Sequence, residues 1–351
     1  MAMPTLLGMP GRQADVVLGG ADAGAHRGAD GDADVHDDAG RLTASPFAAW
    51  LAEVAVQSLM DEAELTPKPA LVDQRGSGAH VDLTLSLMRK SARSLKPGFM
   101  AMAHATTQGL PDLALRERLG AIGRDAEQAM LQATRGSNAH RGAIWVIGLL
   151  VASAAIEGEG ARRMTGSPDA HPHPHTHPRQ PQYRADLPSL AAIGARLAQV
   201  RDRHAPTVAS HGLRVRARYG AQGARGEAVA GFPHVFSVGL PALHVARARG
   251  ECEPHARLNA LVAIMAQLED TCLLHRGGTE ALLTAQQGAK RVLTLGGVGT
   301  AAGWNALLRL DEDLLMRNAS PGGAADLLAA TLFVDRIGSR LADRFSPSHQ
   351  E

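Results

Sequence analysis

Aromatic residues are scarce in this chain of 351 residues, at 3% of the sequence, whereas apolar residues of all kinds reach 45%. Alanine, leucine and valine therefore supply most of the hydrophobic content, and alanine and leucine favour helices over strands. The composition argues against an all-β sandwich or barrel. The length is enough for one large or two ordinary domains with a real core.

Cysteine is also scarce. Cys252 and Cys272 are too few for a disulfide framework and have no CxxC spacing. The first residues, MAMPTLLGMPGRQ, lack the basic and then apolar pattern of a secretory signal. The longest apolar run, 143–156, is too short to span a bilayer and is expected to be a buried helix. These features predict a cytoplasmic protein without membrane contact.

The chain has no excess charge of either sign. Its 36 basic and 35 acidic residues give a formal charge of +1. Binding to nucleic acid through phosphate contacts needs a strong basic excess to displace counterions. We therefore expect no nucleic-acid partner.

Two segments are predicted to lie outside the packed fold. Residues 1–45 are mostly Gly, Ala and Asp, which cannot bury enough surface to offset the entropy of ordering, so this tail is expected to be disordered. Residues 157–187 contain HPHPHTHPRQPQ, whose prolines favour an exposed loop. The rest of 46–345 is predicted to form a single all-α domain. Helices are expected at about 46–63, 81–106, 112–133, 141–156, 187–203, 255–274, 279–293, 301–316 and 322–343.

The expected helix at 112–133 has a clear apolar stripe. Leu115, Leu119 and Ile122 recur at three- and four-residue steps, and Arg116 and Arg124 lie off the stripe. This pattern predicts a core-facing side and a polar side.

Polar junctions between helices carry the residues with chemical potential. The first spans 65–82 and places Lys68 between two prolines, followed by His80 and Asp82. The stiff backbone suits a lysine held at a fixed point toward an anion. A capped loop with a solvated lysine explains the same residues.

The second junction runs from Glu127 to a glycine turn at 133–142, which opens the most apolar helix. Backbone N–H groups at a helix N-terminus attract phosphate, and Asn138, His140 and Arg141 could add donors. His140 could equally be a helix cap.

The third junction, at 223–233, carries Arg225 and Glu227, which could also form a surface ion pair of little energetic value.

The fourth junction, at 268–278, places Asp270 within the expected helix 255–274. A carboxylate in that apolar sequence needs a partner or a metal ion. Magnesium or a triphosphate would meet that need, and an exposed Glu269 is the simpler alternative.

The fifth junction, at 318–326, combines Ser320, Gly322 and Gly323 ahead of Asp326. Such a helix start favours anions. Asp326 in the first turn would also simply stabilise the helix dipole.

Together these stretches resemble the triphosphoribosyl-dephospho-coenzyme A synthase family. The motifs are ELTPKPALVD, GSGAHVDL, EQAMLQATRGSNAHRGAIW, GARGEAVAGFP, EDTCLLHRGG and NASPGGAADLLAATLF, and they cover about 48–340 in one order. The forms GSGAH, AHRGAIW and DTCLLHRGG are similar to the branch of the family that serves malonate decarboxylase.

The resemblance implies a glycosyl transfer. The 2′-hydroxyl of 3′-dephospho-CoA would attack the ribose anomeric carbon of ATP and expel adenine, leaving the triphosphate intact. The product would be the precursor of the prosthetic group on an acyl-carrier subunit, which a further transferase loads. Because no phosphoryl group moves, the absence of a P-loop motif is expected. Magnesium would bridge the phosphates through one or two carboxylates.

Mapping this chemistry onto the motif positions assigns candidate roles. The catalytic candidates are Glu127, Asp326, His140 and His275, with Glu127 and Asp326 as leading general bases. The substrate- or phosphate-binding candidates are Lys68, His80, Asn138, Arg141, Arg225, Glu227, Arg276, Gly277, Gly278, Ser320, Gly322 and Gly323. The metal candidates are Asp82 and Asp270. Two other functions fit the same residues: a magnesium-dependent hydrolase of nucleotide N-glycosidic bonds and a non-catalytic helical nucleotide-binding protein.

Overall fold

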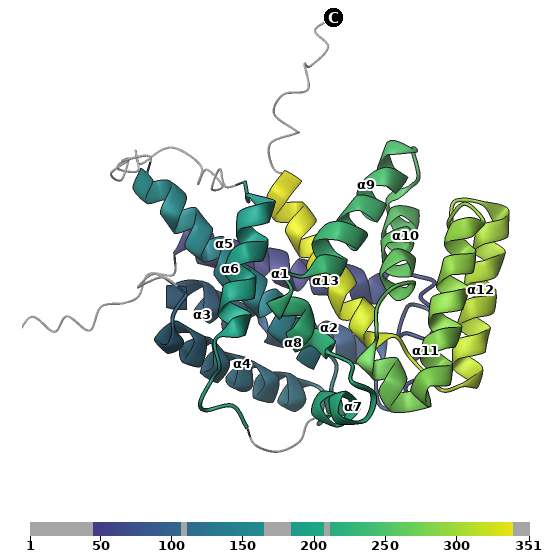
Figure 1. The fold of residues 1–351 in the computed structure, drawn as a ribbon, viewed down its shortest axis with the longest axis horizontal. Helices are drawn as coiled ribbons and strands as arrows, with labels where there is room; N and C mark the ends of the chain where they lie inside the picture. The colour runs from purple at the N-terminus through teal and green to yellow at the C-terminus, as the bar shows by residue number, and fades with distance from the viewer. Residues whose placement is uncertain (1–44, 107–110, 165–183, 207–210, 340–351) are drawn as a thin grey trace, which may run out of the picture. The chain divides into compact units, whose positions relative to one another are not determined.

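A computed structural model describes residues 45–106, 111–164, 184–206 and 211–339, and every regular element in these ranges is a helix, with no strand (Figure 1). The expected all-α fold is confirmed. The described residues belong to one compact unit. The predicted tail at 1–45 falls almost entirely outside the described residues, as does most of the predicted loop at 157–187.

The helices follow one another with short connections. In chain order they are α1 (Pro46–Glu64), α2 (Leu85–Ser94), α3 (Lys96–Ala105), α4 (Leu113–Ala133), α5 (Arg141–Met164), α6 (Leu187–Gln199), α7 (His211–Tyr219), α8 (Gly223–Val229), the π-helix η2 (His234–Gly239), α9 (Leu240–Ala248), α10 (Glu253–Met265), α11 (Thr271–Thr294), α12 (Ala301–Met316) and α13 (Gly322–Ser339).

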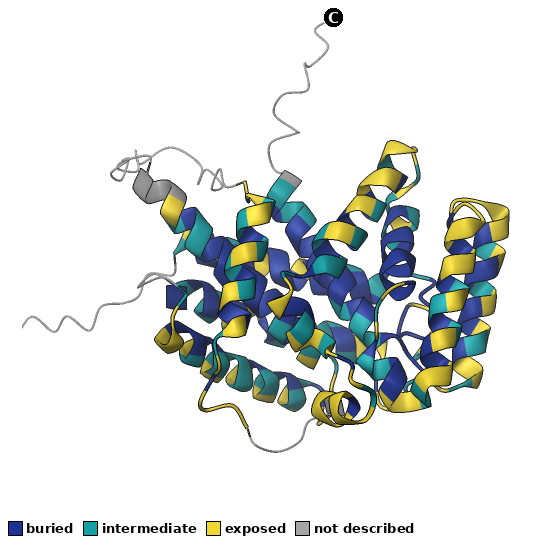
Figure 2. Ribbon diagram, viewed as in Figure 1, coloured by how far each residue is buried: buried dark blue, intermediate teal, exposed yellow. Residues whose placement is uncertain are grey.

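The core lies where α1, α5, α10 and α13 pack together, and Figure 2 shows these helices largely in the colour of buried residues. α13 contacts the other three. Its Leu328, Ala330 and Phe333 are completely buried. Alanine and glycine along α13 leave little side chain between neighbouring backbones, so the helices approach closely. This core sets the starts of α5 and α13 side by side.

α5 contains the apolar run singled out in the sequence. By length and composition 141–160 could cross a membrane, and 72% of its most apolar window is buried inside the fold. α8 followed by η2 and α9 passes the same test only as a pair bent by 80°. The expectation of a buried helix at 143–156 is confirmed, since its side chains pack on α1, α3, α6 and α13.

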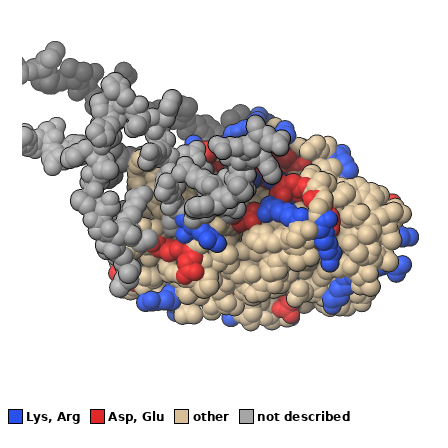
Figure 3. Space-filling model, turned by 90° about the horizontal axis from the view of Figure 1, so that it is seen from above, with Lys and Arg blue, Asp and Glu red and all other residues tan. Residues whose placement is uncertain are grey.

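Charged side chains of both signs lie next to one another on the face drawn in Figure 3, where grey atoms do not cover it. The visible part of this face carries no continuous basic stripe. The arrangement agrees with the balanced charge of the sequence.

Several helix boundaries differ from the prediction. The expected helix 81–106 is two helices, because Pro97 in the first turn of α3 cannot continue the hydrogen bonding of α2. α5 continues to Met164 instead of ending at 156, so the predicted loop begins later. The short helices α7, α8, η2 and α9 were not predicted. Gly220 and Gly231, both with positive φ, divide this region into pieces too short to show a helical period.

The placement of Asp270 inside a helix was wrong. The chain leaves the helix after Met265, and Asp270 is the N-cap of α11. Its Oδ1 accepts hydrogen bonds from the backbone N–H of Cys272 at 2.7 Å and of Leu273 at 3.4 Å. Aspartate is among the best N-cap residues because it satisfies these otherwise unpaired donors.

Candidate active site

The loop between α1 and α2 holds Lys68 at a fixed point, and the anion it meets belongs to the chain itself. Lys68 Nζ lies 2.5 Å from Glu62 Oε1 and donates to the Glu62 carbonyl at 2.7 Å. The side chains are 1% and 3% exposed, so the charges neutralise each other away from water. Glu62, on α1, was not among the predicted residues. Lys68 therefore acts first as the partner of a buried carboxylate.

Asp73 and Arg75 fasten the same loop. Asp73 Oδ2 accepts from the backbone N–H of Lys68 at 2.9 Å, and Arg75 Nε donates to the same oxygen at 2.9 Å. Arg75 also reaches Asp311 of α12 at 2.7 Å, and Asp311 accepts the backbone N–H of Ala70. These contacts hold the loop segment 68–75 together and fasten it to α12.

His80 connects three of the predicted junctions. Its Nε2 lies 2.8 Å from Ser320 Oγ, and Arg276 Nη2 lies 3.0 Å from its Nδ1. Arginine only donates, so Nδ1 accepts and the proton of neutral His80 sits on Nε2, which donates to Ser320. The second arm of Arg276 donates to the Ala79 carbonyl at 3.0 Å. Asp82 is exposed, with its Oδ1 3.9 Å from His80 Nδ1.

His140 is buried at the start of α5. Its Nδ1 lies 2.6 Å from Ser91 Oγ of α2, and its Nε2 has no hydrogen-bond partner. Burial, and then the charge of Lys68, lower the pKa of His140 to about 3. Burial, and then Arg276, lower the pKa of His80 to about 4. Both imidazoles are neutral at pH 7.

The depressed pKa of His80 predicts a measurable pH dependence of stability. The unfolded state takes up a proton near the ordinary pKa of 6.5, whereas folded His80 takes it up only near 4. This residue's contribution to the free energy of unfolding is therefore lost as the pH falls from 6.5 toward 4. Urea unfolding at several pH values should show a larger loss in the wild type than in His80→Asn. Equal slopes for the two proteins would contradict the assignment.

Asp270 joins the starts of two helices. Besides capping α11, it accepts the backbone N–H of Ala324 in α13 through Oδ2 at 2.9 Å. A side chain at Gly323 would bring its Cβ to 3.0 Å from Asp270 Oδ1, and one at Gly322 to 3.0 Å from Cys272 Sγ. The double glycine therefore lets the two helix starts approach. Burial raises the pKa of Asp270, although the backbone donors act in the opposite direction.

Asp326 joins α13 to α5. It accepts the backbone N–H of Ala143, and its carboxylate occupies the space that a side chain at Gly142 would need. Burial, and then the negative charges of Glu62 and Asp270, raise the pKa of Asp326 well above its ordinary value. Asp326 is thus a carboxyl group that can hold a proton closer to neutral pH than an ordinary aspartate.

The N-termini of α5, α11 and α13 therefore converge on two carboxylates, beside the His80 and Ser320 pair. Helix N-termini carry partial positive charge, and here several of their N–H groups already donate to Asp270 and Asp326. Such a place favours the phosphates of a nucleotide, and the raised pKa of Asp326 favours proton transfer next to them.

The remaining predicted residues lie in several places. Glu127, 31% exposed, is paired with Arg141, and Asn138 Oδ1 accepts the backbone N–H of Arg141 at 3.2 Å. Glu227 is buried and pairs with His234 Nδ1 at 2.7 Å, which raises the pKa of His234. Arg225 and His275 are exposed. Gly277 packs beside Ala281, and Gly278 has φ 63°, which marks a kink inside α11.

The two predicted metal ligands, Asp82 and Asp270, lie in different surroundings. Among the residues that the structure describes, no three or more His, Cys, Asp or Glu side chains form a group able to hold a metal ion. Both oxygens of Asp270 already accept backbone N–H groups, whereas Asp82 is exposed beside His80. A magnesium ion that arrives on phosphates needs only one or two carboxylates. Asp82 fits such a role better than Asp270.

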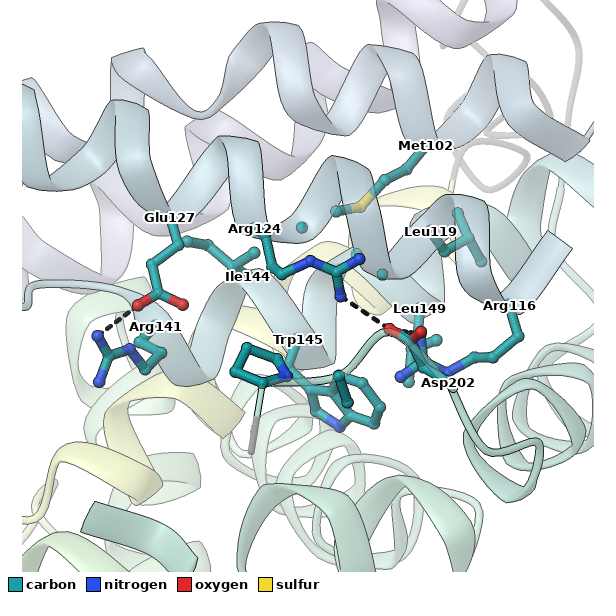
Figure 4. A pocket seen from close by; sticks show the side chains of 15 residues that line it. Met102, Arg116, Leu119, Arg124, Glu127, Arg141, Ile144, Trp145, Leu149 and Asp202 are labelled. Carbon is teal, nitrogen blue, oxygen red and sulfur yellow. Dashed lines mark hydrogen bonds and ion pairs between the residues drawn. The ribbon is translucent and has the colours of Figure 1, made fainter. Parts of the chain in front are cut away.

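A cavity of about 240 Å³ lies between α4 and α5, and we call it the α4/α5 groove (Figure 4). Arg141 and Glu127 stand at one end, and Arg116 and Asp202 at the other. Trp145 lines it between them. No role was predicted for Arg116, Trp145 or Asp202, although Trp145 is the last residue of the motif AHRGAIW.

Comparison with known proteins decides the family. The model of the CitG family, described as ATP:dephospho-CoA triphosphoribosyl transferase, matches residues 48–345. The chain belongs to this family. It is therefore an enzyme, a transferase, and the resemblance read from the junction motifs is confirmed.

Relatives with this description are similar over most of the chain. One from Klebsiella pneumoniae, a 2-(5''-triphosphoribosyl)-3'-dephosphocoenzyme-A synthase, is 48% identical over 84% of this chain and 97% of its own length. Probable synthases of the same name from Pseudomonas fluorescens and Azotobacter vinelandii are each 53% identical over 82% of this chain, and over 91% and 90% of their own lengths. No solved structure matches.

Proposed function

We propose that this enzyme makes 2'-(5''-triphosphoribosyl)-3'-dephospho-CoA from ATP and 3'-dephospho-CoA, with release of adenine. Membership of the family supports the two substrates. The convergence of three helix N-termini beside a carboxyl group of raised pKa is the structural observation that supports the reaction. It offers a place for a triphosphate and a proton acceptor within one cluster.

At the anomeric carbon the reaction breaks one bond and forms one, and one proton moves. The 2'-oxygen of the acceptor bonds to the anomeric carbon of the ATP ribose, the bond from that carbon to adenine breaks, and a proton passes from the hydroxyl to the departing base. Positive charge grows on the sugar as the base leaves. In this proposal Asp326 takes the hydroxyl proton late, as that charge develops. A carboxylate of raised pKa is a stronger base than an ordinary one.

The chain's donors hold the triphosphate. Arg276 and the hydroxyl of Ser320 meet at His80, beside the positive ends of α5 and α13. Because His80 donates to Ser320, the serine hydroxyl proton is left to point at a ligand. Magnesium would neutralise phosphate charge when bound, and Asp82 is the open carboxylate beside this cluster. Fixed donors of this kind stabilise charge without reorganisation during the reaction.

The destination of the product is a further part of the proposal. The malonate decarboxylase branch of the resemblance rests on GSGAH, AHRGAIW and DTCLLHRGG. We infer that a second transferase loads the product onto the acyl-carrier subunit of that decarboxylase. A cytoplasmic location suits both proteins. The two free cysteines agree with such a location.

Product analysis tests the reaction type. Incubation with ATP, magnesium and 3'-dephospho-CoA should give free adenine and the triphosphoribosyl product in equal amounts, resolved by chromatography, with no ADP, AMP or pyrophosphate. Adenine formed equally fast without acceptor would favour the hydrolase. Nucleotide binding without any product would favour the non-catalytic protein.

A further inference from the structure

The α4/α5 groove has the features of a built ligand site. Its walls are mostly apolar and include Met102, Leu119 and Ile144, whereas guanidinium groups stand at its ends (Figure 4). Arg116 lies with its charge 4.8 Å from the centre of the Trp145 ring. Ligand sites combine apolar walls with a few placed polar groups in this way.

Arginines in the lining of the groove outnumber the carboxylates there. Asp202 is the shared counter-ion of two arginines, with its Oδ2 2.8 Å from Arg124 Nη1 and 3.8 Å from Arg116 Nη1. Burial lowers the pKa of Arg116, and the neighbouring Arg225 and Arg124 lower it further against the effect of Asp202. Asp202 thus serves two arginines, so an anionic ligand would relieve their repulsion.

Arg116 also has an unused hydrogen-bond donor. Its side chain is only 8% exposed, it lines the groove, and its Nε–H has no partner. A buried donor left unpaired costs free energy comparable to its desolvation. A ligand with an acceptor oxygen at this end of the groove would remove that cost.

Glycines keep the groove open. Gly120, Gly123 and Gly148 line it from within helices, where glycine is less stable than alanine by about 1 kcal/mol. A side chain at Gly120 would collide with Asp202, whereas a Cβ at Gly123 would make only ordinary contact with Met102, at 3.7 Å. A larger side chain at 123 would therefore fill the groove without displacing backbone.

We propose that the α4/α5 groove binds the acceptor, 3'-dephospho-CoA, with its diphosphate at Arg116 and Arg124 and an apolar part of the molecule along the wall of Trp145. The proposal rests on the proposed function, which places the ATP triphosphate at the helix N-termini. At about 240 Å³ the groove is smaller than the roughly 300–1,000 Å³ of a complete small-molecule site, so it takes part of the coenzyme.

Position connects the groove to the reaction centre. Arg141 lines the groove, and the adjacent Gly142 packs against Asp326. The first turn of α5 is thus the boundary between the two sites. An acceptor bound in the groove has its ribose near that turn, where its 2'-hydroxyl can meet Asp326.

Filling the groove tests the proposal. Gly123→Leu should raise the KM for 3'-dephospho-CoA and weaken its binding in calorimetry by at least about tenfold, with ATP binding within twofold of the wild type. Gly160→Leu is the matched control. Gly160 also lies within a helix, α5, but it is exposed and has open space around it. It should leave both ligands unaffected.

A charge variant provides a second measurement. Arg116→Met should weaken 3'-dephospho-CoA binding, and Arg118→Met, on the exposed side of α4, should not. Unchanged acceptor binding in both Gly123→Leu and Arg116→Met would overturn the proposal, as would a loss confined to ATP. If the wild type itself neither binds 3'-dephospho-CoA nor forms product, the proposed function fails. If it does both and the variants match it, only the groove assignment fails.

Discussion

Asp326→Asn is expected to lower turnover by about 10²- to 10⁴-fold while ATP binding survives, the usual contribution of a general base. Asparagine keeps the shape and the carbonyl oxygen that accepts the N–H of Ala143, but it cannot take a proton. The measurement is kcat for adenine release, together with ATP affinity by calorimetry. Circular dichroism and a melting curve would establish that the helices persist.

Glu127→Gln is the matched control for this variant. Glu127 and Asp326 were the two leading bases in the sequence, yet Glu127 is partly exposed and paired with Arg141, whereas Asp326 stands among helix N-termini near Glu62 and Asp270. We expect Glu127→Gln to retain turnover within about tenfold of the wild type, a loss below the range typical of a general base. The reverse ranking of the two variants would remove Asp326 from the role.

Lys68→Met is expected to lower the free energy of unfolding by about 3–5 kcal/mol, because it leaves the Glu62 carboxylate buried without its partner. The two side chains are almost completely inaccessible to water, so no solvent can replace the lysine. Urea unfolding would measure the loss.

Lys96→Met is the corresponding surface variant. Lys96 Nζ lies 2.6 Å from Glu53 Oε2, but the two side chains are 49% and 58% exposed. Surface pairs of this kind contribute about 0–1 kcal/mol. A loss in Lys68→Met no greater than that in Lys96→Met would show that the protein tolerates Glu62 without a cation.

Local patterns were enough to predict much of the fold. α1, α4 and α12 begin and end close to their expected bounds, since their apolar periodicity is regular. Proline stands in the first turn of α1, and Asp112 and Thr300 cap α4 and α12. Leu115 and Leu119 face the core as the stripe on α4 predicts. Arg116 is the exception. It lies off that stripe and is nevertheless buried, because α4 is covered on a second side by the segment that carries Asp202.

The site could be predicted only in pieces. The motifs marked His80, Arg276 and Ser320 separately. Arg276 is 196 positions and Ser320 is 240 positions from His80, and no local pattern indicates a contact over such a separation. Glu62 stands among other charged residues at the end of α1, where burial has no signature in the sequence. Its one indirect sign was Lys68, since a lysine held between two prolines needs a fixed anion.

Asp270 is the shared hydrogen-bond acceptor for the starts of two helices. The first N–H groups of α11 and those of Gly323 and Ala324 in the first turn of α13 all donate to the same carboxylate. If either helix start opens, the Asp270 carboxylate moves and the other helix loses its hydrogen-bond acceptor. The two starts therefore open together as one cooperative unit. Because α13 also holds Asp326 and α11 also carries Arg276, local unfolding at this point dismantles the proton acceptor and the phosphate clamp in a single step.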